Sequence, residues 1–357
     1  MDDTIPPAAH TNEVFYVGGE AITDTHGTEY YHGQIYVEHL TPVKKPLNPH
    51  PIICIPGGGR TGIDFLPSPA LSSPSTSSWS SLLLSHCYDL YLIDPPFRGR
   101  SPVSPLPLDY ATFPPAKVKS AWSSAQLSDR LTMNHILAST HPQLSDLAHE
   151  QRLSQKGCIE LLEGISQPAF LLSHSMGAKT AWLVADSRPD LVKGIIAVEP
   201  AGPPFKGVGV NGQRKETARY GITDAPITYE PEGTELKVCK VQPGHDSTTT
   251  TTTEDKGRIA VLLQDDCGGT EEVKKLVNLR DIPVLVVTGE MSAHRGYDWG
   301  TVEFLRQAGV GNVEHVQLED SGVRGNGHML MMEGNRGEVG RILVEWIGRI
   351  TGQRTTG

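Results

Sequence analysis

The segment 169–185 limits the fold of this chain more strictly than any other part of the sequence. Residues 169–172 form a short apolar run of the kind that is buried on both faces of a sheet, and a turn of small residues follows at 173–177. Apolar residues then recur with a helical period: Ala178, Ala181, Trp182 and Ala185. A strand that passes through so tight a turn into a helix is typical of an alternating α/β chain, and it presents the central residue of the turn at the carboxyl edge of the sheet.

Apolar runs of strand length recur along the whole chain. They lie at 13–17, 30–39, 52–55, 90–93, 169–172, 194–198, 284–288 and 313–318. The first two are close together and alternate as in an antiparallel pair, whereas the later runs are typical of buried parallel strands. A second helical pattern lies near the carboxyl end, at 339–350. We therefore predict an α/β fold: an eight-stranded, mostly parallel sheet with helices on both faces.

Two polar stretches, 102–155 and 203–281, interrupt this alternation. We expect both to be cap or lid insertions over the carboxyl edge of the sheet, within a single domain that spans residues 1–357. The stretch 246–256 contains a run of threonines with no apolar face to bury, and we expect a flexible loop there.

The composition places further limits on function. The 357 residues carry a formal net charge of -10, which disfavours nucleic acid and anionic membrane surfaces as partners. The first residues lack the positive start and apolar run of a secretory signal, and no later run is long enough to span a bilayer, so we expect a cytoplasmic protein. The five cysteines form no CxxC pair, so the sequence indicates no metal site and no disulfide framework.

Ser175, at the centre of the turn, is the candidate nucleophile. Such a turn strains its central residue, and small residues two positions before and after it let the strand and the helix approach closely. Ser173 stands where the G-x-S-x-G pattern has its first glycine, and serine is still small enough for this contact. The alternative role for Ser175 is that of a helix cap. We expect His174 to be a packed neighbour that points away from the histidine serving Ser175.

A serine hydroxyl becomes a good nucleophile only when a base takes its proton. His328 is the candidate base, because it lies in a glycine-containing loop after the last predicted strand and before the last helical pattern. The imidazole in turn needs a carboxylate to fix its tautomer. Three residues near the ends of successive strands are candidates for this acid: Glu199, Glu290 and Asp298.

The attack on a carbonyl creates an oxyanion, which requires preorganised N–H groups. The glycine-rich loop 56–60 follows the third predicted strand, so the N–H groups of Gly58 and Met176 are the natural pair for an oxyanion hole. A phosphate-binding loop is the alternative interpretation, but the lysine and hydroxyl residue of a P-loop are missing, as is the full spacing of a dinucleotide motif. We therefore expect no cofactor.

With these elements placed, the chain resembles the α/β-hydrolase superfamily over nearly its whole length, and more closely a divergent group of bacterial and fungal esterases. The segments that carry the resemblance are 17–19, 33–38, 55–62, 94–101, 172–177 and 325–329. In that group the acid is a glutamate after the sixth strand, which implies Glu199 rather than Glu290 or Asp298. The resemblance also implies a structural role for Arg98 and Arg100, and Pro56 replaces the histidine that often begins the oxyanion loop.

These residues predict a carboxylic ester hydrolase that cleaves an ester or lactone of a hydrophobic small molecule through Ser175, His328 and Glu199. Apolar residues of the expected caps favour such a substrate: Phe97, Tyr110, Phe113, Trp122, Met133, Phe205 and Tyr220. The alternative is a tailoring enzyme of secondary metabolism that uses the histidine for cyclisation, C–C cleavage or lyase chemistry. A non-catalytic receptor is a third reading, and the sequence leaves both a monomer and a homodimer open.

Overall fold

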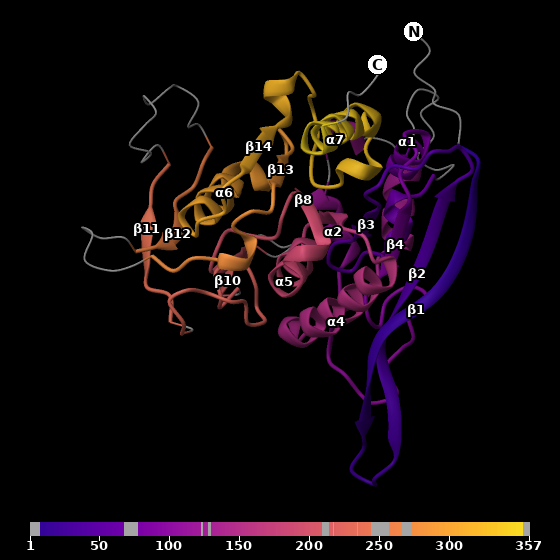
Figure 1. The fold of residues 1–357 in the computed structure, drawn as a ribbon. Helices are drawn as coiled ribbons and strands as arrows, with labels where there is room; N and C mark the ends of the chain where they lie inside the picture. Colours follow the sequence, from indigo (N-terminus) through magenta and orange to yellow (C-terminus); the bar gives the residue numbers. More distant parts are fainter. Residues whose placement is uncertain are drawn as a thin grey trace.

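The structure is a computed structural model, and it describes residues 8–67, 78–122, 124–127, 130–208, 214–216, 218–233, 235–243, 257–265 and 273–352. A sheet of eight strands crosses the molecule in the order β1-β2-β4-β3-β7-β8-β13-β14 (Figure 1). Its strands are β1 (His10–Thr23), β2 (Glu29–Pro42), β3 (Ile52–Ile55), β4 (Leu90–Asp94), β7 (Ala169–His174), β8 (Val192–Val198), β13 (Val284–Thr288) and β14 (Val313–Gln317). β2 is antiparallel to both of its neighbours, and the other neighbouring strands are parallel. The predicted eight-stranded, mostly parallel sheet is therefore confirmed.

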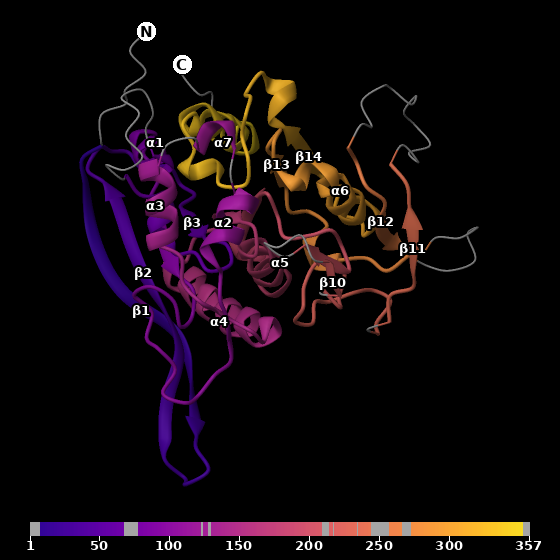
Figure 2. The ribbon, with the colours of Figure 1, turned by 180° about the vertical axis from the view of Figure 1, so that it is seen from behind.

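Helices cover both faces of this sheet (Figures 1 and 2). On one face lie α1 (Trp79–Ser85) and α7 (Arg336–Thr351), and on the other lie α4 (Leu147–Ile165), α5 (Gly177–Ser187) and α6 (Asp298–Gln307). Successive strand residues alternate between the two cores: in β3, Ile53 packs with α4 and α5, whereas Cys54 packs with α1 and α7. Both faces of the inner parallel strands are buried, which explains their largely apolar sequences, whereas the edge strand β14 is partly exposed and carries polar residues.

The antiparallel pair β1–β2 is longer than the sequence pattern predicted. Its ladder runs from the His10–Pro42 pair to the Thr23–Glu29 pair, and the hairpin projects well beyond the rest of the molecule (Figure 1). The apolar alternation that defined 13–17 and 30–39 covers only the part near the sheet. Beyond it, the strands continue because backbone pairing persists where few side chains are buried.

The first polar stretch contains several short elements. They are β5 (Tyr110–Ala111), α2 (Pro115–Trp122), the 3-10 helix η3 (Ala125–Leu127), α3 (Arg130–Ala138) and β6 (Gln143–Leu144). Helix α4 follows and packs on β1 and α5. The expected insertion 102–155 therefore ends inside α4, whose first residues belong to the layer that covers the sheet. Below, "first segment" denotes residues 102–146.

The second polar stretch, 203–281, is called the second segment below. Its described elements are β9 (Lys206–Val208), β10 (Arg214–Glu216), β11 (Val238–Val241), β12 (Val261–Gln264) and the 3-10 helix η6 (Val277–Leu279). β9 pairs with β10 and β11 with β12, and β12 packs on α6. The loop expected at 246–256 lies outside the described residues.

The remaining short helices are 3-10 turns. They are η1 (Gly62–Phe65), η4 (Pro189–Leu191), η7 (Ala293–Gly296), η8 (Leu318–Ser321) and η9 (Leu330–Met332). Two of them, η7 and η9, flank the loop that carries His328 and so help to position it.

Candidate active site

Ser175 lies in the turn between β7 and α5 and has a left-handed backbone, with φ of 50°. Its N–H donates to the carbonyl of Val198 at 3.0 Å, and its carbonyl accepts the N–H groups of Ala178 and Ala201. A Cβ at Gly177 would lie 2.5 Å from the carbonyl oxygen of Ile55, so only glycine allows the helix to start this close to β3. The Ser175 hydroxyl makes no hydrogen bond within the described residues, which leaves it open to a substrate and to a base.

His328 faces the carboxylate of Glu199, with 3.1 Å between Nδ1 and Oε2. Glu199 follows β8, is fully buried and also has a left-handed backbone, with φ of 49°. The N–H of Gly289 donates to Oε1 at 2.6 Å, and the Ser292 hydroxyl donates to Oε2. The carboxylate is therefore fixed by a backbone and a side-chain donor while it orients the imidazole.

The two other candidate acids have different partners. Glu290 accepts the N–H of Gly325 at 2.9 Å and pairs with Arg324 at 3.0 Å, and these contacts lower the pKa of Glu290. Glu290 thus holds the first residues of the loop that carries His328. Asp298, at the start of α6, contacts His294 instead. Of the three acids, the structure brings only Glu199 to His328.

Two further histidines pack against His328. His174 donates from Nε2 to the carbonyl of His328 at 2.9 Å, and the two ring centroids are 4.6 Å apart. The ring of His294 stacks on His328 with centroids 4.7 Å apart and an interplanar angle of 18°. Burial, followed by the proximity of His328, holds the pKa of His174 well below its usual value, and burial lowers the pKa of His294 to about 3. Both flanking rings are therefore neutral near pH 7.

The expectation that His174 points away from the partner histidine is wrong. Its side chain turns towards the loop of His328 because a backbone carbonyl there accepts its Nε2 hydrogen, while its Nδ1 faces the backbone at Gly57. His174 is a packed neighbour, as expected, but one that anchors the loop of the candidate base.

Glu199, His294 and His328 bring three atoms of metal-ligating type within 4.8 Å of one another among the described residues. Two of these atoms already face each other at 3.1 Å across the His328–Glu199 contact. Nδ1 of His294 is occupied by Asp298. The His328–Glu199 contact therefore already engages two of the three atoms, and we interpret the cluster as an acid–histidine pair with a neighbouring imidazole.

The glycine-rich loop after β3 lies beside the turn that contains Ser175. A Cβ at Gly57 would lie 3.0 Å from Cβ of Ser175, and a Cβ at Gly58 would lie 3.1 Å from Cγ of Met176. Within the described residues, the N–H groups of Gly58 and Met176 donate to no protein acceptor. Arg98 holds this loop from behind by donating to the carbonyl of Gly57 at 2.8 Å. The loop is therefore able to offer N–H groups to an oxyanion next to Ser175.

Aromatic side chains of the first segment border this site. Trp122 lies 6.2 Å from His328 between ring centroids, and Phe113 lies 6.3 Å from Trp122 and against Gly59. Two other aromatic residues expected to face a substrate pack elsewhere: Phe97 against His32, and Phe205 against Phe304. The apolar character of the site thus comes from the first segment.

Glu333, just after η9, connects the first segment to the loop of His328. It is fully buried, and its carboxylate accepts the Ser124 hydroxyl at 2.8 Å, the Gly327 N–H at 2.8 Å and the Asn326 amide at 2.7 Å. Burial raises the pKa of Glu333 to about 7, although these hydrogen bonds oppose the shift. A single ionisable group therefore ties the residue before His328 to the first segment.

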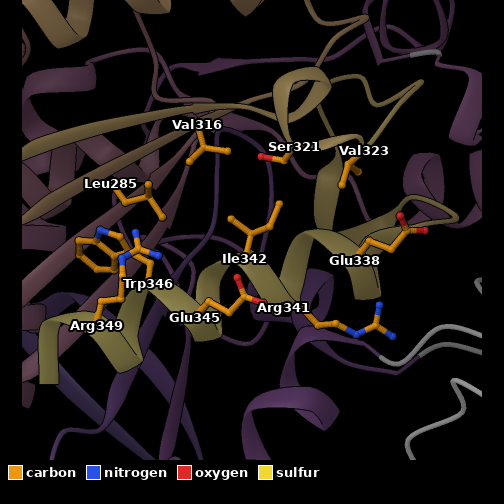
Figure 3. Close-up of a pocket in the computed structure, with 10 residues that line it drawn as sticks. All are labelled: Leu285, Val316, Ser321, Val323, Glu338, Arg341, Ile342, Glu345, Trp346 and Arg349. Carbon is orange, nitrogen blue, oxygen red and sulfur yellow. The ribbon is translucent and has the colours of Figure 1, made fainter. Parts of the chain in front are cut away.

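A surface groove of about 400 Å³ lies apart from this cluster, between β14, η8 and α7 (Figure 3). Its floor is apolar and its α7 side is charged; the lining residues are Leu285, Val316, Ser321, Val323, Glu338, Arg341, Ile342, Glu345, Trp346 and Arg349. No candidate site residue lines it, so we do not assign the chemistry to this groove.

Sequence reasoning missed Ser292, His294 and Glu333. A signal for one of them is visible afterwards: His294 and Asp298 are four residues apart at the start of a helix, where an i, i+4 pair meets. Neither Ser292 nor Glu333 carried such a pattern. Their roles depend on how η7 and η9 pack beside the loop of His328.

Fold and site geometry are those of an α/β-hydrolase, and comparison with known proteins agrees. No family model matches the chain. It is 34% identical over 355 residues to a protein named "Probable secreted lipase phiG" from Fungal sp. (strain ATCC 74256), covering 93% of this chain and 88% of that protein. A solved bacterial esterase, 19% identical, superposes with a TM-score of 0.65 over 97% of this chain and 98% of its own, which supports the fold. The chain belongs to the α/β-hydrolase family of esterases and lipases.

Membership of this family confirms the prediction of a carboxylic ester hydrolase. The predicted cytoplasmic location, in contrast, is wrong. The fungal relative is named as a secreted lipase, which contradicts an inference made from the first residues of the chain and from the lack of a long apolar run. No helix among the described residues has the length and apolarity needed to cross a membrane.

Proposed function

We propose that the protein is a serine hydrolase that cleaves an ester or lactone of a hydrophobic small molecule. The contact between His328 and the buried Glu199 carboxylate, at 3.1 Å, is the observation that carries this proposal. It supplies the oriented base that a serine nucleophile requires. The strained turn at Ser175 supports the assignment of the nucleophile, because such strain persists where the surrounding structure enforces it.

In the proposed reaction, Ser175 Oγ attacks the carbonyl carbon while His328 Nε2 takes the hydroxyl proton. Glu199 stabilises the imidazolium that forms. The N–H groups of Gly58 and Met176 bind the oxyanion of the tetrahedral intermediate, and each such donor contributes roughly 3 kcal/mol to lowering the barrier. The imidazolium then protonates the leaving alcohol, and water, activated by the same histidine, releases the acid and restores Ser175.

The substrate class follows from the border of the site. Trp122 and Phe113 offer apolar surface next to the base and the glycine loop. Gln143 adds one polar group, since its Oε1 lies 2.6 Å from the position of a Cβ at Gly58. We therefore propose an apolar acyl or alkyl group beside the first segment, with its ester carbonyl directed towards Gly58.

The name of the fungal relative extends the proposal to location: we propose that this protein is also secreted. Production of the chain in a filamentous fungus tests this. Accumulation of active protein in the medium supports secretion, and its retention in washed cells contradicts it.

The test of the proposed chemistry is labelling with a fluorophosphonate, together with hydrolysis of a short-chain aryl ester. We expect the wild type to be labelled on Ser175, Ser175→Ala to lose both label and turnover, and Glu199→Gln to lose on the order of 10³–10⁴-fold in kcat. Glu290→Gln is the matched control, because it removes a nearby carboxylate that contacts the loop of His328 but not its imidazole.

The opposite pattern rejects these assignments. If Glu290→Gln loses activity while Glu199→Gln keeps it, the choice of acid is wrong. If the wild type is not labelled and Ser175→Ala turns over a substrate that His328→Ala does not, the histidine serves a non-hydrolytic reaction such as a lyase or cyclisation step.

A further inference from the structure

A second acid–histidine pair lies directly behind the proposed triad. Asp298 is fully buried and its Oδ1 lies 3.1 Å from Nδ1 of His294. The other nitrogen of this ring, Nε2, faces Oε2 of Glu199 at 3.9 Å. The same ring stacks on His328. The proposed mechanism uses neither Asp298 nor His294, yet His294 lies against both its acid and its base, and Asp298 holds His294.

The geometry indicates where the hydrogens of this pair reside. A lone pair on Nε2 of His294 facing the Glu199 carboxylate would be repulsive, whereas an N–H there is attractive. A neutral ring with its hydrogen on Nε2 has a lone pair on Nδ1, which needs a donor. The group facing Nδ1 is Oδ1 of Asp298, so this tautomer of His294 places a proton on Asp298.

The contacts of the other carboxyl oxygen of Asp298, Oδ2, are consistent with this order of donors and acceptors. The Thr288 hydroxyl donates to Oδ2 of Asp298 at 2.7 Å, and the same hydroxyl oxygen lies 2.9 Å from Nε2 of His315. With the hydrogen of His315 on Nε2, each donor in the series meets one acceptor, from His315 through Thr288, Asp298 and His294 towards Glu199. No contact in this series brings two hydrogens, or two lone pairs, against each other.

We propose that Asp298 is a protonated acid that, through His294, directs an N–H dipole at Glu199, so that the negative charge of this cluster resides on Glu199 alone. This inference rests on the proposed function, and it makes Asp298 and His294 positioning residues for the His328–Glu199 pair. A fully buried carboxylic acid without a cationic partner favours its neutral form, and the hydrogen-bond partners of Asp298, Thr288 and the neutral His294, carry no charge.

The ionisable groups around the pair agree with this assignment. Burial holds the pKa of Asp298 well above its usual value and lowers the pKa of His315 to about 4. Tyr297 packs on His294 at 4.7 Å between ring centroids, and burial keeps it in its neutral phenol form by raising its pKa. The neutral His174 also packs on His328, with 4.6 Å between ring centroids, and Glu333 is near enough to Glu199 for their charges to interact.

The first test is the pKa of the His328 imidazole in Asp298→Asn, measured by NMR on protein labelled with ¹³C at histidine Cε1. An asparagine amide donates to Nδ1 of His294 and accepts from Thr288 as a protonated acid does, so we expect the pKa of His328 to stay within ~0.3 units of the wild-type value. Glu199→Gln is the matched contrast: it makes the same acid-to-amide change in the charged member, and we expect it to lower the pKa of His328 by ~1 unit or more. A similar drop in Asp298→Asn would overturn the proposal.

The second test separates the N–H dipole from simple filling of space. His294→Gln keeps a donor near Glu199, whereas His294→Leu keeps only apolar volume. We expect kcat of the leucine variant to fall by about tenfold with KM nearly unchanged, and the glutamine variant to recover most of this loss. If leucine performs as well as glutamine in this buried site, His294 only packs, and the proposal fails.

Labelling of Ser175 distinguishes a failure of the hydrolase assignment from a failure of the proposal for Asp298. If the wild type is labelled by a fluorophosphonate but Asp298→Asn lowers the pKa of His328, the hydrolase assignment stands and this inference is wrong. If the wild type is not labelled, the hydrolase assignment is wrong. The NMR titration of His328 then still decides whether Asp298 carries a charge.

Discussion

The first and second segments look alike in sequence, since both are polar interruptions of an alternating fold, yet they relate differently to the active site. The first segment reaches it: Trp122 borders His328, and Ser124 binds the carboxylate that holds the histidine loop. The described part of the second segment makes no hydrogen bond to Ser175, Glu199 or His328; its ties lead to α5 and α6 through Asp224 and Gln264. Composition therefore identifies an insertion but not the surface that it covers.

The largest expected difference comes from removing the buried cation that binds each segment: Arg60 for the first and Lys179 for the second. Arg60 is fully buried and binds Asp64, the carbonyl of Ile136 at 2.9 Å and the Thr140 hydroxyl at 2.8 Å, so it ties the glycine loop to α3. We expect Arg60→Met to cost ~3–5 kcal/mol in the free energy of unfolding, because Asp64 is left as a buried unpaired charge. We expect kcat/KM to fall by at least about tenfold as the glycine loop loosens.

Lys179→Met is the matched change for the second segment. Lys179 on α5 is buried and binds Asp224 at 2.6 Å, and Asp224 is slightly exposed, so we expect a smaller loss of ~2–3 kcal/mol. Here kcat/KM should stay within about twofold, because the side chain of Lys179 binds Asp224 and not the proposed reacting groups. Urea unfolding and ester hydrolysis measure both variants; equal losses of activity would contradict the distinction between the segments.

The next effect is the pH dependence of the free energy of unfolding. It has opposite signs for Glu333, which binds the first segment, and for Asp224 of the second segment. Burial raises the pKa of Glu333 from 4.5 to about 7, so the native state binds this proton more tightly than the unfolded chain does. The resulting stabilisation, about 3 kcal/mol at most, is present below pH 4.5 and is lost as the pH rises through 7. We expect Glu333→Gln to remove this loss, so that its free energy of unfolding changes less between pH 5 and pH 8 than that of the wild type.

Asp224 provides the opposite case. Burial acts to raise the pKa of Asp224, but Lys179 and hydrogen bonds outweigh it and hold the pKa below 3.8. Its stabilisation is therefore present above that pH and is lost as the pH falls further. Urea unfolding of Asp224→Asn and Glu333→Gln across pH tests both signs, and a parallel response of the two variants would show that the segments are not tied in different ways.

The smallest expected effect concerns substrate contact. Trp122→Ala removes the apolar surface beside His328, and we expect kcat/KM for a bulky aryl ester to fall by about tenfold, mainly through KM. Phe205→Ala is its counterpart in the second segment: Phe205 packs edge-on against Phe304 with centroids 5.5 Å apart. It should cost ~1–2 kcal/mol of stability and leave the kinetics within about twofold. A larger kinetic effect from Phe205 than from Trp122 would reverse the roles assigned to the segments.

The sheet and the order of the site residues could be predicted because both depend on local patterns. The six strands that pair in parallel lie where the apolar runs predicted them, and β1 and β2 contain the two alternating runs. Gly58, Ser175, Glu199 and His328 each follow a strand, and parallel strands bring their carboxyl ends to one edge. Chain order and strand position were therefore sufficient to bring these residues together.

The second layer around His328 could not be predicted in the same way. His294 lies in a short 3-10 helix whose position depends on packing against α6, and the orientation of His174 depends on a carbonyl 154 residues away. Ser292 and Glu333 contribute through bonds to groups that no local pattern links to them. Such contacts are set by tertiary structure, to which residue spacing is a poor guide.

The left-handed backbones of Ser175 and Glu199 also affect how this chain evolves. Each non-glycine residue in that region costs ~1–2 kcal/mol, and the two lie at the ends of adjacent strands. A glycine at either position relieves the cost in the same step that removes the proposed nucleophile or the proposed acid. Inactive descendants can therefore gain stability at once, and only continued selection for turnover keeps these two side chains in place.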